Sequence, residues 1–336
     1  MKKVVAIVLV LALSLGLISP ALAQTSPFHD VSPDAWYADA VAFVYEEGIM
    51  GGVGGNQFNP QGNVSRAEVT ALLFRMHHGR NANANDPRDN PFTDVGDSWY
   101  APYVTWAYIN GIVNGTTAES FNPQGNVTRQ EFAVMLHRYT MRMTVMGSSF
   151  GTSPQWYYFT DHDEIANWAS LPLRWANYFG IIRGTSETTI SPTGTATRAE
   201  AATMMMRLVG VIRELEELVA DFELTVWVEE TSVAQGELFR IHIEFSNHGE
   251  NDHELRFMNN LFWVVFPQQD SGSMPGIHQT KIFKAGSTIQ STQNIGSRLS
   301  PGAYELRVEA RFFLEREGGG VHRISIFSSP IMLTVK

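Results

Sequence analysis

One arginine recurs at the same place in three short motifs of this chain. The motifs read Val-Ser-Arg-Ala-Glu, Val-Thr-Arg-Gln-Glu and Ala-Thr-Arg-Ala-Glu, and their arginines are Arg66, Arg129 and Arg198. A hydroxyl residue followed three positions later by glutamate is typical of a capping box, so each motif predicts a helix start. A cation in the first turn opposes the helix dipole by roughly 0.3–1 kcal/mol. We therefore expect a bound anion, held by the guanidinium and the helix amides together.

The residues expected to form the three capping boxes are Ser65 with Glu68, Thr128 with Glu131, and Thr197 with Glu200. The arginines also have a purely structural interpretation, in which each one pairs with a carboxylate of its own repeat and binds no ligand. The sequence leaves both interpretations open.

Each arginine motif is preceded by an aspartate and by a tryptophan that also recur. The aspartates are Asp30, Asp94 and Asp161. They are expected either to cap or turn the chain before a helix, or to accept hydrogen bonds from a hydroxylated ligand. The tryptophans are Trp36, Trp99 and Trp168, each 30 residues before its arginine. They are expected either to pack in the core or to form a flat platform for a ligand.

Aligned on these tryptophans, three segments superpose without a gap, and they run over residues 28–78, 92–143 and 159–212. Each segment reads as helix, loop and helix, with a glycine of positive φ at the end of the first helix. A hairpin of about 50 residues buries too little apolar surface to stand alone, so the three should pack together. Trp106 and Trp175 are expected in that shared core.

From Phe222 onward, apolar residues alternate with polar ones, which is strand periodicity. Six to eight short strands in about 115 residues predict an immunoglobulin-like β-sandwich. The fold class is therefore multidomain α + β. A Pro-Gly turn at Pro301 also gives this part a loose resemblance to BsuPI-type proteinase-inhibitor domains.

Composition and charge narrow the function. The formal net charge of −10 argues against nucleic acid as a partner. The chain has no cysteine, which excludes disulfides and thiolate chemistry. Residues 1–23 read as a signal peptide, so we expect a secreted protein that starts at Gln24 and has no membrane span after cleavage.

Motifs for catalysis are missing. The sequence has no Gly-x-Ser-x-Gly, no His-Glu-x-x-His and no phosphate-binding glycine loop. His242, His248 and His253 are expected at the surface rather than on zinc, and residues 161–164 as a turn rather than a calcium site. We therefore expect no catalytic residue, no metal and no cofactor.

The repeats resemble S-layer homology domains. The resemblance rests on the opening Phe-x-Asp-Val, the Trp-Tyr or Trp-Ala start, the glycine pair, the Phe-x-Pro turn and the Thr-Arg-Ala-Glu element, over residues 28–212. It implies a pseudo-threefold helical bundle whose grooves bind secondary cell wall polymers, often with pyruvylated sugars. By that resemblance the three arginines would grip the acidic sugar, with the aspartates and aromatics completing the grooves. Repeat three departs from the pattern at His162 and at Ile190-Ser191.

The predicted organisation is a signal peptide at 1–23, repeats at 24–80, 88–146 and 155–213, a helical linker at 214–220, and a sandwich at 221–336. The leading hypothesis is a non-catalytic protein of the bacterial cell surface, cell wall or S-layer. Its repeats would bind a peptidoglycan-linked polysaccharide, and its sandwich would meet a protein or glycan partner. The alternatives are an anchored proteinase inhibitor or enzyme, active in the C-terminal part, and a self-assembling lattice protein.

Overall fold

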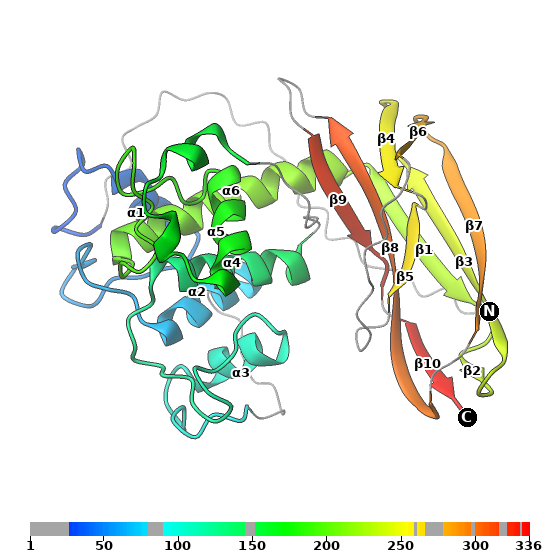
Figure 1. Cartoon of the computed structure of the whole chain (residues 1–336), viewed down its shortest axis with the longest axis horizontal. Coiled ribbons are helices and arrows are strands. Elements are labelled where there is room, and N and C mark those ends of the chain that lie inside the picture. The colour runs from blue at the N-terminus through cyan, green and yellow to red at the C-terminus, as the bar shows by residue number, and fades with distance from the viewer. Residues whose placement is uncertain are drawn as a thin grey trace.

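The structure is a computed structural model that describes residues 27–79, 90–144, 152–258, 261–265, 278–296, 300–315, 321–329 and 331–336. The expected signal peptide lies outside these residues, as does the segment between the first two predicted repeats. Helices occupy the first part of the chain and strands the second (Figure 1). The predicted α + β class is confirmed.

Each repeat contributes two α-helices, as predicted. They are α1 (Ala38–Glu46) and α2 (Arg66–His78), α3 (Ala101–Ile109) and α4 (Arg129–Met143), and α5 (Asn167–Tyr178) and α6 (Arg198–Val219). Two short 3₁₀ helices, η1 (Pro154–Tyr158) and η2 (His162–Glu164), precede α5, so most of the expected turn at 161–164 is a 3₁₀ helix.

Local sequence signals set the ends of these helices. All three capping boxes form, with the hydroxyl accepting from the glutamate amide and the glutamate accepting from the hydroxyl residue's amide. The first helix of each repeat ends before Gly48, Gly111 or Gly180, with φ of 71°, 65° and 69°. A left-handed backbone favours glycine there, because a Cβ would be strained.

The three repeats close into a ring. The second helix of each repeat packs against the first helix of the next: α2 on α3, α4 on α5, and α6 back on α1. At the centre the amides of Val64, Ala196 and Val127 donate in a cycle to the carbonyls of Ala196, Val127 and Val64, at 3.0, 2.9 and 2.9 Å. This cycle gives the bundle its pseudo-threefold axis.

The core of the bundle is formed by buried apolar side chains from all three repeats. Trp106 and Trp175 are buried, as predicted. Each loop between helices also buries one residue at an equivalent position, Phe58, Phe121 or Ile190, so the isoleucine of repeat three fills the place of a phenylalanine. Ser191 adopts φ of 52°, close to the 58° and 57° of Asn59 and Asn122. The Ile190-Ser191 departure therefore keeps the backbone conformation that the other two loops have at this point.

The strands form two sheets. Their bounds are β1 Phe222–Val228, β2 Ser232–Val233, β3 Leu238–Asn247, β4 His253–Met258, β5 Phe262–Val265, β6 His278–Phe283, β7 Thr288–Gly296, β8 Gly302–Glu315, β9 Val321–Phe327 and β10 Ile331–Val335. One sheet has the order β1-β3-β7. The other has the order β2-β10-β8-β4-β6, with β5 and β9 also paired to β8. Pairing is antiparallel except between β2 and β10.

The two sheets pack face to face through aromatic side chains. Phe222 and Phe245 of the smaller sheet contact Phe283 and Phe312 of the larger one, with ring centroids 5.0–5.7 Å apart. The prediction of six to eight strands is too low, because the described residues contain ten. Two of these strands are hard to recognise in the sequence, because β2 has only two residues and β7 is mostly polar. The immunoglobulin-like topology and the BsuPI-type resemblance stay predictions.

Helix α6 leads directly into the sandwich. It continues through the charged residues 213–218, as expected, and only Ala220 and Asp221 separate it from β1.

Candidate functional site

The three motif arginines are buried, and each reaches into the next repeat around the ring. Their relative exposures are 7% for Arg66, 3% for Arg129 and 6% for Arg198. Their Nε atoms donate to the carbonyls of Phe121, Ile190 and Phe58, at 2.9, 3.0 and 2.7 Å. The expectation that each arginine pairs within its own repeat is therefore wrong.

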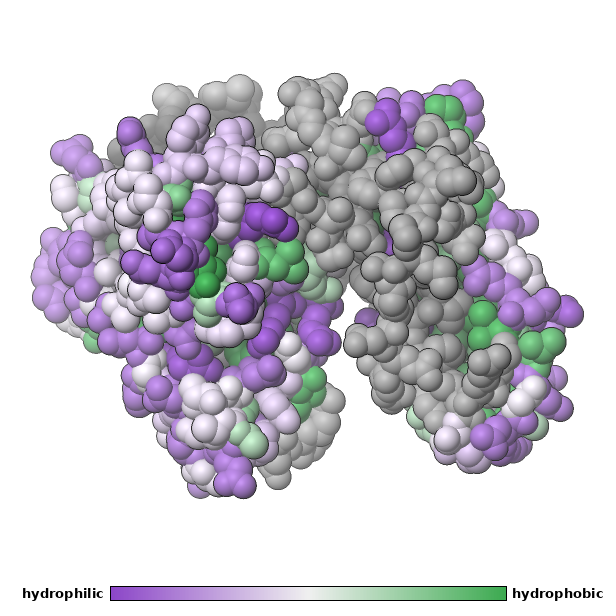
Figure 2. All heavy atoms as spheres, viewed as in Figure 1, coloured by the Kyte–Doolittle hydropathy of each residue, from purple (hydrophilic) through white to green (hydrophobic). Residues whose placement is uncertain are grey.

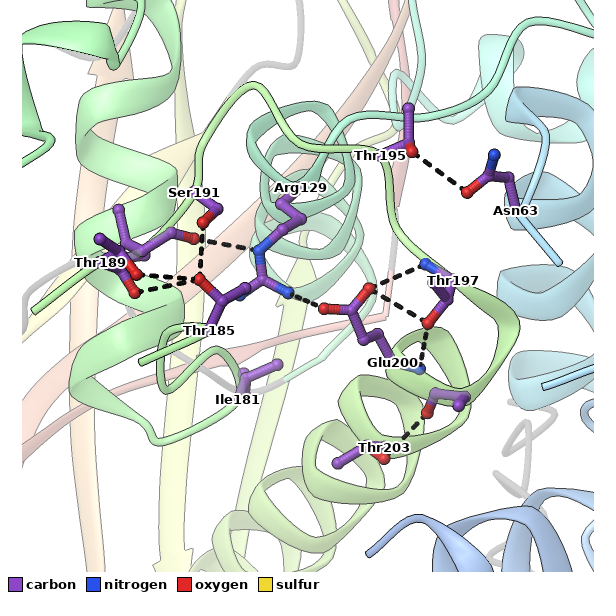
Figure 3. A network of polar contacts seen from close by, with 12 residues as sticks. Asn63, Arg129, Ile181, Thr185, Thr189, Ser191, Thr195, Thr197, Glu200 and Thr203 are labelled. Carbon is purple, nitrogen blue, oxygen red and sulfur yellow. Dashed lines mark hydrogen bonds and ion pairs between the residues drawn. The ribbon is translucent and has the colours of Figure 1, made fainter. Parts of the chain in front are cut away.

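Each arginine also forms an ion pair with the capping-box glutamate of the neighbouring repeat. Arg129 Nη1 lies 2.7 Å from Glu200, whose other carboxylate oxygen accepts from Thr197 (Figure 3). Arg66 pairs with Glu131 at 3.0 Å, and Arg198 pairs with Glu68 at 3.4 Å. Each of these glutamates thus caps its own helix and also forms an ion pair with the arginine of the preceding repeat. Burial lowers the pKa of all three arginines, and the paired glutamates oppose that shift.

The helix amides beside these arginines already have partners. In the first motif the Arg66 and Ala67 amides donate to the carbonyls of Gly125 and Pro123, at 2.9 and 3.0 Å, and the Glu68 amide donates to Ser65 Oγ. The other two motifs repeat this arrangement. The expectation that the amides share an anion with the arginine is therefore wrong.

The recurring aspartates fasten the loop between the helices. Asp30 accepts the amides of Phe58 and Asn59, both at 2.8 Å. Asp94 and Asp161 do the same for the loops of their repeats. The expected helix cap is wrong, because these carboxylates bind backbone 27–30 residues away. Burial by itself would raise the pKa of Asp30 and Asp94, but the backbone hydrogen bonds outweigh it and lower the pKa.

Three equivalent hollows open between the repeats. We call them groove 1, groove 2 and groove 3, after the repeat that supplies the glutamate. Groove 1 has about 530 Å³ and is lined by Glu68, Gly52, Arg75, Arg198 and Trp99, among others. Groove 2 has about 360 Å³ and is lined by Glu131, Gly115, Arg138, Arg66 and Trp168. Groove 3 has about 360 Å³ and is lined by Glu200, Gly184, Arg207, Arg129 and Trp36. The three aspartates are not among the lining residues.

Every groove is assembled from all three repeats. The glutamate and the glycine come from one repeat, the buried arginine from the repeat before, and the tryptophan from the repeat after. Trp36, Trp99 and Trp168 are 67%, 58% and 58% exposed. A tryptophan this exposed contributes little to a core, so its ring is free to contact a ligand. On the visible face of the helical half, hydrophobic areas are small and separate among hydrophilic side chains (Figure 2).

Each groove also holds a second arginine, which we call the outer arginine. The outer arginines are Arg75, Arg138 and Arg207, nine residues after the motif arginines and half-buried. Sequence reasoning missed this set. The equal spacing of the three residues is visible in the sequence. An arginine in the interior of a helix does not oppose the helix dipole, however, so nothing about these positions pointed to a ligand.

The outer arginines have no acidic partner in the described part of the chain. Arg75 lies over the Tyr103 ring at 5.7 Å, and Arg207 donates to the Ile181 carbonyl at 3.3 Å. Burial lowers the pKa of Arg138, and Arg142 and Arg66 lower it further. Arg207 is similar, because Arg183 and Arg129 add to the effect of burial. Each groove thus carries positive charge that its glutamate does not balance.

His242, His248 and His253 of the sandwich each lie beside a different acidic residue. His242 lies 3.1 Å from Glu229, His248 lies 2.9 Å from Glu223, and His253 lies 4.0 Å from Asp221. Within the described ranges, no group of three or more His, Asp or Glu side chains is placed to hold a metal ion. Nor does any described helix have the length and apolar character needed to cross a membrane.

The bundle is thus a module made by internal triplication, with three like grooves on a closed ring of repeats. A family model described as the S-layer homology domain matches residues 27–70, 91–133 and 158–202. The chain therefore contains three S-layer homology domains. These domains make it a secreted protein of the cell surface, associated with the cell wall.

Curated relatives share these domains. The chain is 30% identical over 193 residues to an exoglucanase XynX of Acetivibrio thermocellus, covering 56% of this chain and 17% of the relative. It is 27% identical over 201 residues to an S-layer protein of Bacillus thuringiensis subsp. finitimus, covering 60% of this chain and 23% of the relative. The chain thus spans less than a quarter of the length of either relative.

A solved structure overlaps with 34% of the chain. It is the crystal structure of the C-terminal domain of wzt. The match covers 74% of that structure, with 9% sequence identity and a TM-score of 0.24. A likeness at this level carries no argument about the fold or the ligand.

Proposed function

We propose that the three grooves attach the protein noncovalently to an anionic secondary cell wall polymer, with a pyruvylated sugar as the ligand. The observation that carries this proposal is the triplicate pairing of an exposed tryptophan with excess positive charge in one hollow. Trp99, for example, borders groove 1 together with Arg75 and Arg198. A sugar offers a C–H face to an indole ring, and a pyruvate ketal adds a carboxylate that a guanidinium binds.

Three grooves on one rigid ring suit a polymer better than a free sugar. A chain of repeating sugars presents the same acidic group many times, so binding in one groove raises the effective concentration for the next. Avidity then holds the protein on the wall although each groove is shallow and open. The motif arginines and the tryptophans would form the groove walls, and the aspartates would support them by holding the loops.

We also propose that the C-terminal sandwich is displayed from this anchor and has no catalytic role. The exoglucanase and the S-layer protein both extend far beyond the shared region. One kind of anchor thus accompanies different partners, which is expected when attachment and activity lie in separate parts of a chain.

The test is sedimentation with cell wall sacculi. Purified residues 24–336 should pellet with sacculi that carry their secondary polymer and stay in solution with sacculi from which acid has removed it. A variant with Trp36, Trp99 and Trp168 changed to Ala should lose pelleting and keep its melting temperature, because these side chains are exposed. A matched control changes Tyr157, Tyr158 and Trp227 to Ala, since these exposed aromatics lie outside the grooves.

Two results would overturn the proposal. One is equal pelleting with intact and polymer-free sacculi. The other is equal loss of pelleting in the tryptophan variant and in the control variant.

A further inference from the structure

We propose that the outer arginines Arg75, Arg138 and Arg207 hold the acidic group of the ligand, while the motif arginines lock the ring. This division of roles rests on the proposed glycan-binding function of the grooves. It assigns the charge contact to residues outside the Thr-Arg-Ala-Glu element.

The motif arginines have few donors left for a ligand. Arg66 donates from Nε to Phe121, from Nη1 to Glu131 and from Nη2 to Asn114, at 2.9, 3.0 and 3.1 Å. Arg198 likewise uses all three nitrogens, with Phe58, Glu68 and Gly51 as acceptors. Because each charge is already matched by a glutamate, a ligand anion gains little from it and would compete with the ion pair.

The outer arginines, unlike the motif arginines, are not paired with a glutamate in the described part of the chain. They are half-buried, and among the described residues no carboxylate lies within ion-pair distance of them. Arg138 also lies near two like charges, Arg142 and Arg66, and Arg207 lies near Arg183 and Arg129. A partly desolvated cation beside other cations is unfavourable, and a bound carboxylate would relieve both effects.

The spacing along the helix places the two arginine sets at different points of one groove. In groove 2, Glu131 and Arg138 lie seven residues apart on α4, which is two helical turns and about 10.5 Å of helix rise. The motif Arg66 lies at the Glu131 level through its ion pair. The groove therefore has a neutral end, formed by that pair, and a cationic end at Arg138, with room between them for a sugar ring.

The same layout recurs in the other two grooves. Glu68 and Arg75 on α2, and Glu200 and Arg207 on α6, have the same seven-residue spacing. We infer that the ligand lies along the second helix of each repeat, with its acidic group toward the outer arginine and its neutral sugar face toward the tryptophan.

The test compares two triple variants that each remove three positive charges. In the outer variant, Arg75, Arg138 and Arg207 are changed to Gln. In the control variant, Arg213, Arg240 and Arg256, which are exposed or only partly buried and line none of the grooves, are changed to Gln. Sacculus pelleting should be lost in the outer variant and kept in the control, while both variants keep melting temperatures close to that of the parent protein.

A small probe shows which group the outer arginines contact. Calorimetry would use a methyl glycoside with a pyruvate ketal, beside the methyl ester of the same compound, which lacks the charge. The parent protein should prefer the acid by about tenfold to a hundredfold per groove, as expected for a charge-assisted hydrogen bond. The outer variant should bind the acid and the ester equally.

The outcomes separate this inference from the proposed function. If the parent protein pellets and the tryptophan variant does not, the grooves bind the wall. Unchanged pelleting and an unchanged preference for the acid in the outer variant would then overturn the assignment to the outer arginines. If the parent protein does not distinguish intact from polymer-free sacculi, the proposed function itself fails, and this inference fails with it.

Discussion

Replacing Arg129 with Ala should destabilise the whole ring, although the residue lies in the wall of groove 3. Its side chain is 4% exposed, its Nη1 lies 2.7 Å from Glu200, and its Nε donates to the Ile190 carbonyl. The substitution leaves Glu200 without its cation and the carbonyl without its donor.

The magnitude follows from the burial of the two partners. Breaking a buried ion pair on one side costs about 3–5 kcal/mol. The Glu200 side chain is 19% exposed, so water compensates part of the loss and the lower end applies, about 3 kcal/mol. The carbonyl of Ile190 adds about 1 kcal/mol. The free energy of unfolding should thus fall by about 4 kcal/mol in total, which lowers the melting temperature by roughly 10 °C.

The assay is urea unfolding of residues 24–336, followed by tryptophan fluorescence. The matched control is Arg207→Ala, which removes an arginine from the same groove that has no carboxylate partner in the described residues and should cost about 1 kcal/mol or less. The double variant Arg129→Met with Glu200→Gln should recover part of the loss, because no unpaired charge stays behind. If Arg129→Ala cost as little as Arg207→Ala, the ring would not depend on this ion pair.

Three further predictions concern pH, the loops and salt. Burial lowers the pKa of His137 to about 4, with Arg138 adding to the effect, and its Nε2 has no hydrogen-bond partner in the described structure. Because the folded-state pKa lies below the usual 6.5, the unfolded chain binds more protons between pH 6.5 and 4. Stability should therefore decrease as the pH is lowered from 6.5 to 4, and His137→Phe should make this decrease smaller in thermal melts. Asp94→Asn should lower the melting temperature at pH 7, and the difference should shrink as the pH falls below 3.8 and through the lowered pKa of Asp94. The reason is that a lowered carboxyl pKa stabilises the fold fully above its ordinary value and loses this effect as the group is protonated, so a difference that does not change with pH would contradict it. Pelleting with sacculi should weaken steadily as sodium chloride is raised from 50 to 500 mM, as measured by the unbound fraction, and no salt dependence would exclude a charged ligand.

The parts of the fold that depend on local sequence rules were predicted from the sequence, because those rules act over only a few residues. Thr128 and Glu131 form a capping box within one turn of helix, so a single motif predicts the helix start. Gly111 ends α3 because glycine tolerates its φ of 65° without a neighbour's help. Strands such as β9 alternate in hydropathy, whereas the polar β7 was missed because it lacks that alternation.

The site was harder to predict, because its residues meet over long separations. Arg198 pairs with Glu68, 130 positions earlier in the chain, and this contact exists only because the third repeat packs against the first. Asp30 was expected near a ligand or a helix end, yet it binds amides 28 and 29 positions away. The choice between core and platform for Trp36 also depends on packing, which leaves it exposed beside a groove of two other repeats.

The sequence by itself therefore determined the repeats, their helix ends, the α + β class and the residue types available for binding. Those features depend on periodicity and on contacts within a few residues. The tertiary structure decided which arginines are neutralised and which are left with excess charge. That distinction arises from closing three repeats into a ring, because ring closure buries Arg66, Arg129 and Arg198 against the glutamates of neighbouring repeats and leaves Arg75, Arg138 and Arg207 facing the grooves.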